Sequence, residues 1–295
     1  MISYRLGFAL FAVLFVSPLL LADDSSPTAA QPLNWHDDYG TAYAAAKEHQ
    51  RLLLIHFQAA PASAYEKELQ ATLAQPNVRE LCGKLELLRI PTTYEVSVGG
   101  KQSPLLKHAG FAALGNKPGL AIVDLKNADR DCYAQTVSAV PFERIGYYAP
   151  SPTSVRSLRT LLQLPAGTLT QRTMVYAVRL HPEQPASTRG QAAPLLFSEA
   201  AGHSASMART GVQGHQGFDA RFQRISGSLG SAAQEVVAES WPGEDLVSAC
   251  FSCVHSWRGS PGHWSAVSGA QHAYGYDIRH GARGVWYATG LFSGR

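Results

Sequence analysis

Apolar and polar positions along the first half of the chain predict helices and strands in alternation. The alanine-rich stretch 38–50 predicts a helix, and the apolar run 51–57 predicts a buried strand directly after it. Polar residues 126–130 predict a hairpin turn. Further helical or periodic stretches are expected at 62–74, 78–88 and 155–164, and a short strand at 117–124. This alternation predicts an α/β layer structure.

The chain opens with the pattern of a secretory signal. Arg5 is followed by the mostly apolar run 6–21 and by the small residue Ala22, so we expect a signal peptide over residues 1–22. A retained membrane anchor is the alternative, because Leu20 is a poor residue three places before the cut and the run is near the minimum length for a bilayer. Nothing after residue 30 is apolar enough to cross a membrane. We therefore expect no stable membrane span after processing, and a secreted, periplasmic or cell-envelope protein.

Composition limits the partners. The formal net charge of +3 is spread along 295 residues, without a basic block or an aromatic-plus-arginine cluster, so we expect no nucleic acid to bind. The chain is long enough for two ordinary domains. Its 4 cysteines are too few for a scaffold built on disulfides, although export permits oxidation.

The first predicted domain covers residues 23–164. From Trp35 to about Leu164 it resembles exported thioredoxin-like domains, which open with a tryptophan, an alanine-rich helix and an apolar strand. Pro118 matches the cis-proline that precedes a strand in that family. Redox-active members carry Cys-x-x-Cys after the first core strand, where the helix N-terminus lowers a thiol's pKa. Residues 58–65 contain no cysteine at this place, so we expect a scaffold or binding module without redox activity.

Residues 165–193 are rich in Pro, Gly, Ser and Thr. This composition predicts a linker, with one embedded element of undecided type at 174–178.

The last hundred residues carry short motifs in a fixed order. They are His-Ser and Met-Ala within 200–208, Gly-His at 214–215, Arg221 and Arg224, Glu-Val within 234–238, and Trp-x-x-Ser-Pro-Gly-His at 257–263. In this order they resemble bacterial CAP (SCP) superfamily domains, and the tryptophan motif is the most specific part. Strand-like stretches at 274–277 and 285–292 match the two strands that close such domains. The resemblance implies an α-β-α sandwich over residues 194–295.

This resemblance also implies a cleft containing His215, Glu235 and His263. Two neutral imidazoles and one carboxylate would suit zinc or another divalent metal. Two polar family positions differ here: a second glutamate is replaced by Ser260, and the asparagine after Glu235 by Val236. Each change removes a group that would bind or orient a ligand. The alternative is that both histidines hydrogen-bond to Glu235 and stabilise the fold.

The remaining cysteines and histidines predict packing. Cys250 and Cys253 have the spacing of a redox motif, yet Val247, Val254 and Trp257 recur at helical spacing around them and place both in mid-helix. Thiol exchange and zinc binding are the alternatives there. Cys82 and Cys132 are expected to be buried thiols or one structural disulfide. Spacing suggests no partner for His203, His255, His272 and His280, so each is expected to be solvated or in a core.

These features predict a two-domain exported protein with a binding or structural role. The partner would be a small ligand, a lipid or a protein. The sequence does not choose among these three, because a fold alone specifies no activity. A metal-dependent hydrolase is the alternative, with Glu235 as general base toward a metal-bound water. No Ser-His-Asp order or Gly-x-Ser-x-Gly turn indicates a covalent mechanism.

Overall fold

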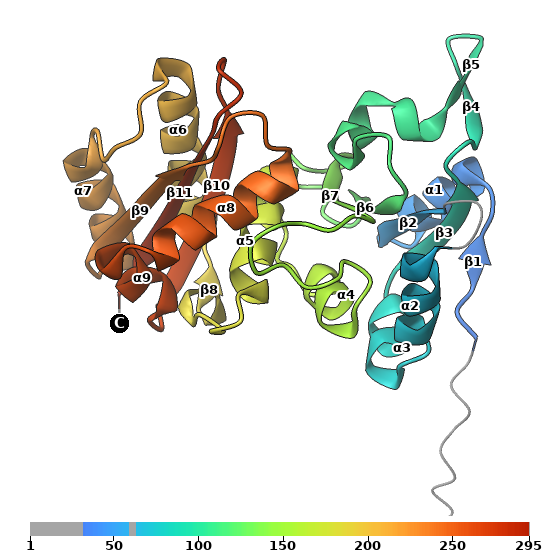
Figure 1. The fold of residues 1–295 in the computed structure, drawn as a ribbon, viewed down its shortest axis with the longest axis horizontal. Coiled ribbons are helices and arrows are strands. Elements are labelled where there is room, and N and C mark those ends of the chain that lie inside the picture. Colours follow the sequence, from blue (N-terminus) through green and yellow to red (C-terminus); the bar gives the residue numbers. More distant parts are fainter. Residues whose placement is uncertain (1–31, 59–62, 295) are drawn as a thin grey trace, which may run out of the picture. The chain divides into compact units, whose positions relative to one another are not determined.

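The computed structural model describes residues 32–58 and 63–294. The predicted signal peptide and the alternative anchor lie outside the described residues. The chain from Pro32 onward forms one compact unit. Its secondary structure is mixed α/β, as predicted, and two large sheets form its framework (Figure 1).

The first sheet has the strand order β1-β3-β2-β6-β7. Strands β1, β3 and β2 run parallel, whereas β6 and β7 each pair antiparallel to the strand before them in this order. The strand bounds are β1 Trp35–His36, β2 Leu52–Gln58, β3 Glu86–Pro91, β6 Gly119–Asp124 and β7 Thr136–Pro141. A separate hairpin is formed by β4 Glu95–Val98 and β5 Lys101–Pro104.

Both faces of this sheet are buried, as the continuous apolar run of β2 predicts. Leu53 and Ile55 pack with Ala42 and other residues of one core cluster, whereas Leu54 belongs to a second cluster. The sides alternate because successive side chains of a strand point to opposite faces. The helical elements in this half are α1 Tyr39–Glu48, α2 Ala64–Leu73, α3 Pro76–Cys82, η1 Leu105–Lys107, η2 Ala109–Leu114 and α4 Val155–Leu162.

Helix α5, Leu169–Leu180, connects the two halves of the compact unit. Its start is fixed by a capping box, in which the side chains of Thr168 and Gln171 bond to each other's backbone N–H. The helix contacts β7 of the first sheet, and in the second half it contacts both helix α8 (Leu246–Arg258) and strand β10 (Ala273–His280). Met174 and Tyr176 are buried in one core cluster with residues from both halves. The segment 165–193, which the sequence predicts to be a linker with one embedded element at 174–178, contributes that element to the core as part of the buried helix α5.

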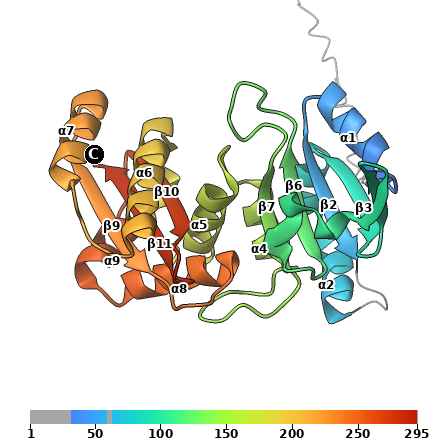
Figure 2. The same cartoon turned by 90° about the horizontal axis from the view of Figure 1, so that it is seen from above.

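The second sheet has the order β8-β10-β11-β9. Its strands are β8 Gln191–Ala192, β9 Ala233–Glu239, β10 Ala273–His280 and β11 Trp286–Ser293. Helices cover both faces: α6 and α7 lie on one side, and α8 and α9 on the other (Figure 2). The bounds are α6 Pro194–Thr210, α7 Phe218–Leu229, α8 Leu246–Arg258 and α9 Pro261–Ser268, with the short η3 Ser187–Arg189 before β8.

Close packing in this half depends on Gly275 and Trp257. A Cβ at Gly275 would lie 2.3 Å from the backbone of Leu196, so only glycine lets α6 approach β10 this closely. Trp257 is fully buried and its ring lies 5.9 Å from that of Tyr276. The tryptophan therefore anchors α8 on the sheet, as its helical spacing predicts.

The cysteines pack as the sequence predicts. Cys250 and Cys253 lie inside α8, away from its N-terminus, and both are buried. All four cysteines are free thiols. Burial raises the pKa of Cys82 to about 11 and the pKa of the Cys250 and Cys253 thiols above the usual range. Neutral, buried thiols are poor nucleophiles.

Across residues 32–58 and 63–294, no helix combines the length and the apolar character needed to cross a membrane.

Candidate functional site

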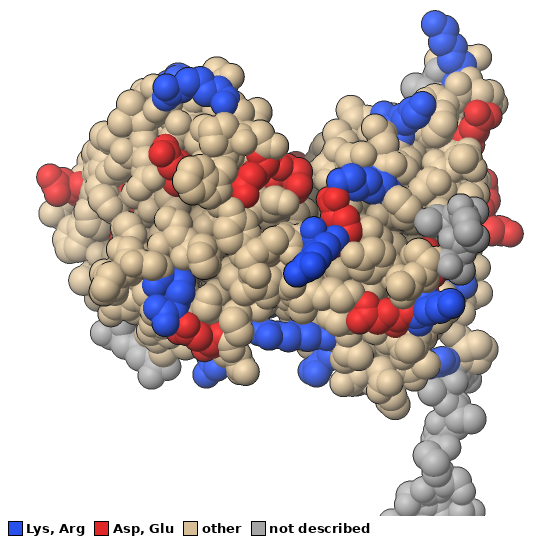
Figure 3. All heavy atoms as spheres, in the orientation of Figure 1, with Lys and Arg blue, Asp and Glu red and all other residues tan. Residues whose placement is uncertain are grey.

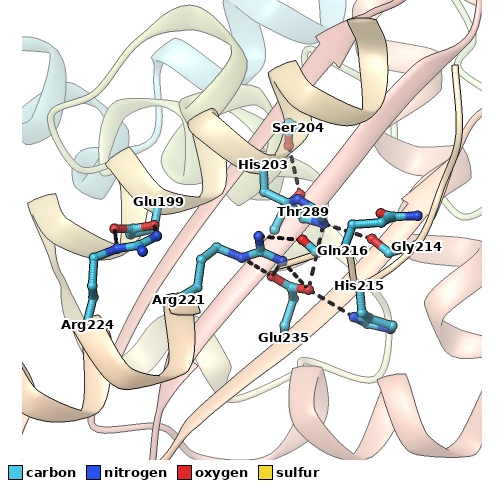
Figure 4. A network of polar contacts seen from close by, with 10 residues as sticks. All are labelled: Glu199, His203, Ser204, Gly214, His215, Gln216, Arg221, Arg224, Glu235 and Thr289. Carbon is cyan, nitrogen blue, oxygen red and sulfur yellow. Dashed lines mark hydrogen bonds and ion pairs between the residues drawn. The ribbon is translucent and has the colours of Figure 1, made fainter. Parts of the chain in front are cut away.

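A buried carboxylate forms the centre of the candidate site. Glu235 lies on β9, and its side chain is only 1% exposed. Arg221, on α7, donates from Nε to Glu235 Oε2 at 2.7 Å and from Nη2 to Oε1 at 2.9 Å. The third guanidinium nitrogen of Arg221 donates to the carbonyl of Gln216 at 2.8 Å (Figure 4). This two-point pairing compensates a charge that would otherwise be costly to bury.

His215 connects the buried carboxylate to the surface. Its Nδ1 lies 2.9 Å from Glu235 Oε1, while its side chain is 48% exposed. The turn that carries it ends at Gly217, whose φ of 70° places it in the left-handed region favoured by glycine. Since Nδ1 donates to the carboxylate, Nε2 carries the free lone pair of the neutral ring. Glu235 thus fixes both the orientation and the tautomer of an exposed imidazole.

His203 belongs to the same network, although its spacing suggested no partner. This α6 residue is buried, its Nε2 donates to the Gly214 carbonyl at 2.8 Å, and the same atom lies 3.7 Å from Glu235 Oε1. Burial lowers the pKa of His203, and the nearby carboxylate offsets only part of that effect. Neutral His203 therefore holds the turn that carries His215.

His263, at the start of α9, lies beside His215. The two ring centroids are 6.0 Å apart, with the planes inclined by 44°. Burial, and then the neighbouring His215, lower the pKa of His263, so its imidazole is neutral at pH 7. Among the described residues, no hydrogen bond joins His263 to Glu235. The structure therefore brings all three predicted residues to one place, with the two histidines adjacent and the carboxylate behind His215.

The helices that frame the site are also tied together. Arg224 on α7 forms a two-point pair with Glu199 on α6, with both N–O distances at 2.8 Å (Figure 4). Val236 is buried in the core cluster on the opposite face of β9, so the position after Glu235 contributes no polar group here. Ser260 is the residue directly before α9.

Glu235 is poorly placed to bind a metal ion directly. Its two oxygens accept hydrogen bonds from Arg221, and Oε1 also accepts one from His215. The described part of the chain contains no group of three or more His, Cys, Asp or Glu residues arranged for a metal ion. The chemistry of the donor set does suit a metal at the two imidazoles, with Glu235 as the outer partner that orients a ligating histidine.

No protein-family model matches this chain, and no curated protein matches it significantly.

Proposed function

We propose that this chain is an exported binding protein whose cleft at His215 and His263 takes up a divalent metal ion such as zinc, or a small ligand recognised by the imidazole pair. The observation that carries the proposal is the exposure of His215 above a carboxylate that is 1% exposed and already neutralised by Arg221. A histidine needed only for packing has no reason to be half exposed. A histidine that donates one N–H to a buried carboxylate presents its other nitrogen to a ligand.

The proposed chemistry assigns each residue a separate task. His215 Nε2 and the His263 ring would supply two nitrogen ligands, since neutral imidazole is the ligating form. Glu235 would orient His215, and Arg221 would hold Glu235 in place. Remaining positions on the metal would be left to water, a small ligand or a partner's side chain.

Two features of the fold support the proposal that the chain combines a CAP-like and a thioredoxin-like fold. The sheet β8-β10-β11-β9 between two helical layers is the architecture that CAP resemblance implies, and the mixed sheet of the first half suits a thioredoxin-like scaffold. We therefore keep both families as part of the proposal, together with a location outside the cytoplasm. N-terminal sequencing of the mature protein should recover a start near residue 23; recovery of Met1 from a membrane fraction would contradict export by cleavage.

Titration calorimetry with zinc on the metal-free protein tests the cleft. At neutral pH we expect binding to the wild type and its loss in His263→Gln. His280→Gln is the matched control, because His280 packs its ring on Trp286, 4.8 Å away between centroids, and lies outside the cleft. No heat in the wild type, or equal loss in both variants, would show that the cluster only stabilises the fold.

The same geometry disfavours the hydrolase alternative. A general base must reach the proton that it abstracts, and Glu235 is buried behind His215 in a charge pair with Arg221. We therefore propose binding without turnover.

A further inference from the structure

Three arginines from three different elements line one hollow outside the cleft. Arg156 lies on α4, Arg179 on α5 and Arg189 at the end of η3, and the hollow between them has a volume of about 440 Å³. Gln184, Pro185 and Thr188 complete its lining. Figure 3 has the orientation of Figure 1 and shows basic side chains along the lower edge of the molecule. They lie between the positions that α4 and β8 occupy in Figure 1.

The positive charge of this hollow is not compensated by the chain. Its lining includes no Asp or Glu, and none of the three arginines forms an ion pair with a described carboxylate. Glu183, which neighbours the lining residue Gln184, is paired with Arg258 and accepts the indole N–H of Trp264 at 3.0 Å. Like charges held together repel each other, so the arrangement has no electrostatic benefit for the protein alone.

Two of the guanidinium groups are held in place by neutral acceptors. Arg179 donates from Nη1 to the Gln163 carbonyl at 2.8 Å and from Nη2 to the Tyr274 hydroxyl at 3.2 Å. Arg156 donates from Nη2 to the His181 carbonyl at 2.9 Å. Because these acceptors are neutral, they do not compensate the positive charges of the two guanidinium groups. Each guanidinium has five N–H donors, so some of its donors remain available for a ligand. Arg189 is exposed, and its side chain forms no hydrogen bond or ion pair with the described residues.

We propose that this hollow is a binding site for an oxyanion of the phosphate class. Guanidinium groups match the oxygens of phosphate in geometry and charge, and three of them around one space favour a dianion over a single carboxylate. The volume leaves room for the group that carries the phosphate, either a small soluble molecule or a lipid headgroup. The site is separate from the histidine cleft, so its test is independent of metal binding.

Titration calorimetry with inorganic phosphate tests the site on the full mature chain. Arg189→Gln should weaken binding about tenfold or more, the size of effect expected for one hydrogen bond to a charged group. Its exposed side chain forms no hydrogen bond or ion pair with the described residues, so we expect unchanged thermal unfolding. Arg130→Gln is the control, because it removes the same charge from an exposed turn residue that does not line the hollow. The affinity of this variant should stay within about twofold, because Arg130 does not line the hollow and salt screens the charges of exposed side chains.

Two further probes distinguish the sources of the phosphate. Tighter binding of a phosphorylated monosaccharide than of inorganic phosphate would identify a soluble ligand. Sedimentation with vesicles of phosphatidylcholine and phosphatidic acid, but not with phosphatidylcholine alone, would identify a lipid headgroup, provided that Arg189→Gln reduces it and Arg130→Gln does not. Absence of binding to all three probes, or equal losses in the two variants, would overturn the proposal.

Discussion

Arg172 donates from Nε to the Ser138 hydroxyl at 2.9 Å, and this bond ties α5 to the edge strand β7 inside the core. The same guanidinium donates from Nη1 to the carbonyls of Leu164 and Pro165, at 3.1 and 2.8 Å, just after α4 ends. Burial lowers the pKa of Arg172 to about 10, so the group stays charged at pH 7. One side chain thereby joins a strand and two helices.

Replacing this arginine should destabilise the whole protein. Arg172→Met keeps much of the side-chain volume but leaves buried carbonyls without a donor, which costs on the order of 3 kcal/mol. Urea unfolding measures the loss. Arg159→Met, at an exposed position on α4, should change little, and a similar loss in both variants would show that Arg172 has no special structural role.

Trp257→Ala should cost about 3 to 5 kcal/mol, the usual range for removing a buried aromatic side chain. Its indole N–H has no hydrogen-bond partner among the described residues, so the loss comes from packing. Trp241→Ala provides the comparison, because Trp241 is 69% exposed and should tolerate the change. Thermal unfolding of both variants measures the difference in stability. An unchanged melting temperature for Trp257→Ala would place α8 outside the core.

A double-mutant cycle tests the pair behind His215. Arg221→Gln leaves the Glu235 carboxylate buried without its cation, and breaking a buried pair in this way costs about 3 to 5 kcal/mol. Adding Glu235→Gln removes that charge and should recover part of the loss. Arg224→Gln breaks the more exposed pair with Glu199 and should cost about 1 kcal/mol or less. Additive losses from the first two changes would show that Arg221 and Glu235 are not coupled.

The folded protein should lose stability as the pH falls from 7 to 5. Burial lowers the pKa of His56, His181, His203 and His263, so below an unfolded value of about 6.5 the unfolded chain binds more protons. Protonation then favours unfolding. Burial raises the pKa of Asp277 above 3.8, which has the opposite effect at lower pH. Melting temperatures at pH 5, 6, 7 and 8 measure the trend, and a rise on acidification to pH 5 would contradict it.

Zinc binding should weaken as the pH falls from 7.5 to 5.5. The lowered pKa of His263 keeps its ring neutral at pH 7, and protons displace the metal only when they compete for the ligand nitrogen. We expect affinity at pH 5.5 to be at least about tenfold below that at pH 7.5. The same affinity at both values, measured calorimetrically, would exclude imidazole ligands.

Several elements of the first half of the fold were predictable from the sequence. The predicted helix at 38–50 and strand at 51–57 correspond to α1 and β2, and the periodic stretch 78–88 divides into α3 and the start of β3. For α5 the sequence predicts only an element of undecided type at 174–178, because this helix is buried on nearly all sides and these five residues are all apolar and buried. Such a helix shows no polar face, and therefore no periodicity. The two-residue strands β1 and β8 depend on their pairing partners, which sequence does not specify.

The candidate site was only partly predictable. Motif order indicated His215, Glu235 and His263, and the structure brings them together. Arg221 belongs to the motif series, but its pairing with Glu235 depends on how α7 packs on β9. His203 is the histidine of the His-Ser motif, but its role in the site has no signal, because its hydrogen-bond partner is a backbone carbonyl and backbone groups leave no pattern in the sequence.

The position of α5 between two sheets has a consequence for biosynthesis. A ribosome completes α5 and the first sheet before it makes α8 and β10, which cover the other side of the helix. During that interval Met174, Val175 and their neighbours expose apolar surface to any other nascent chain, the condition that favours aggregation. Folding of the second half is therefore required to protect the first, and a chain truncated before β10 should be insoluble even though its first sheet is complete.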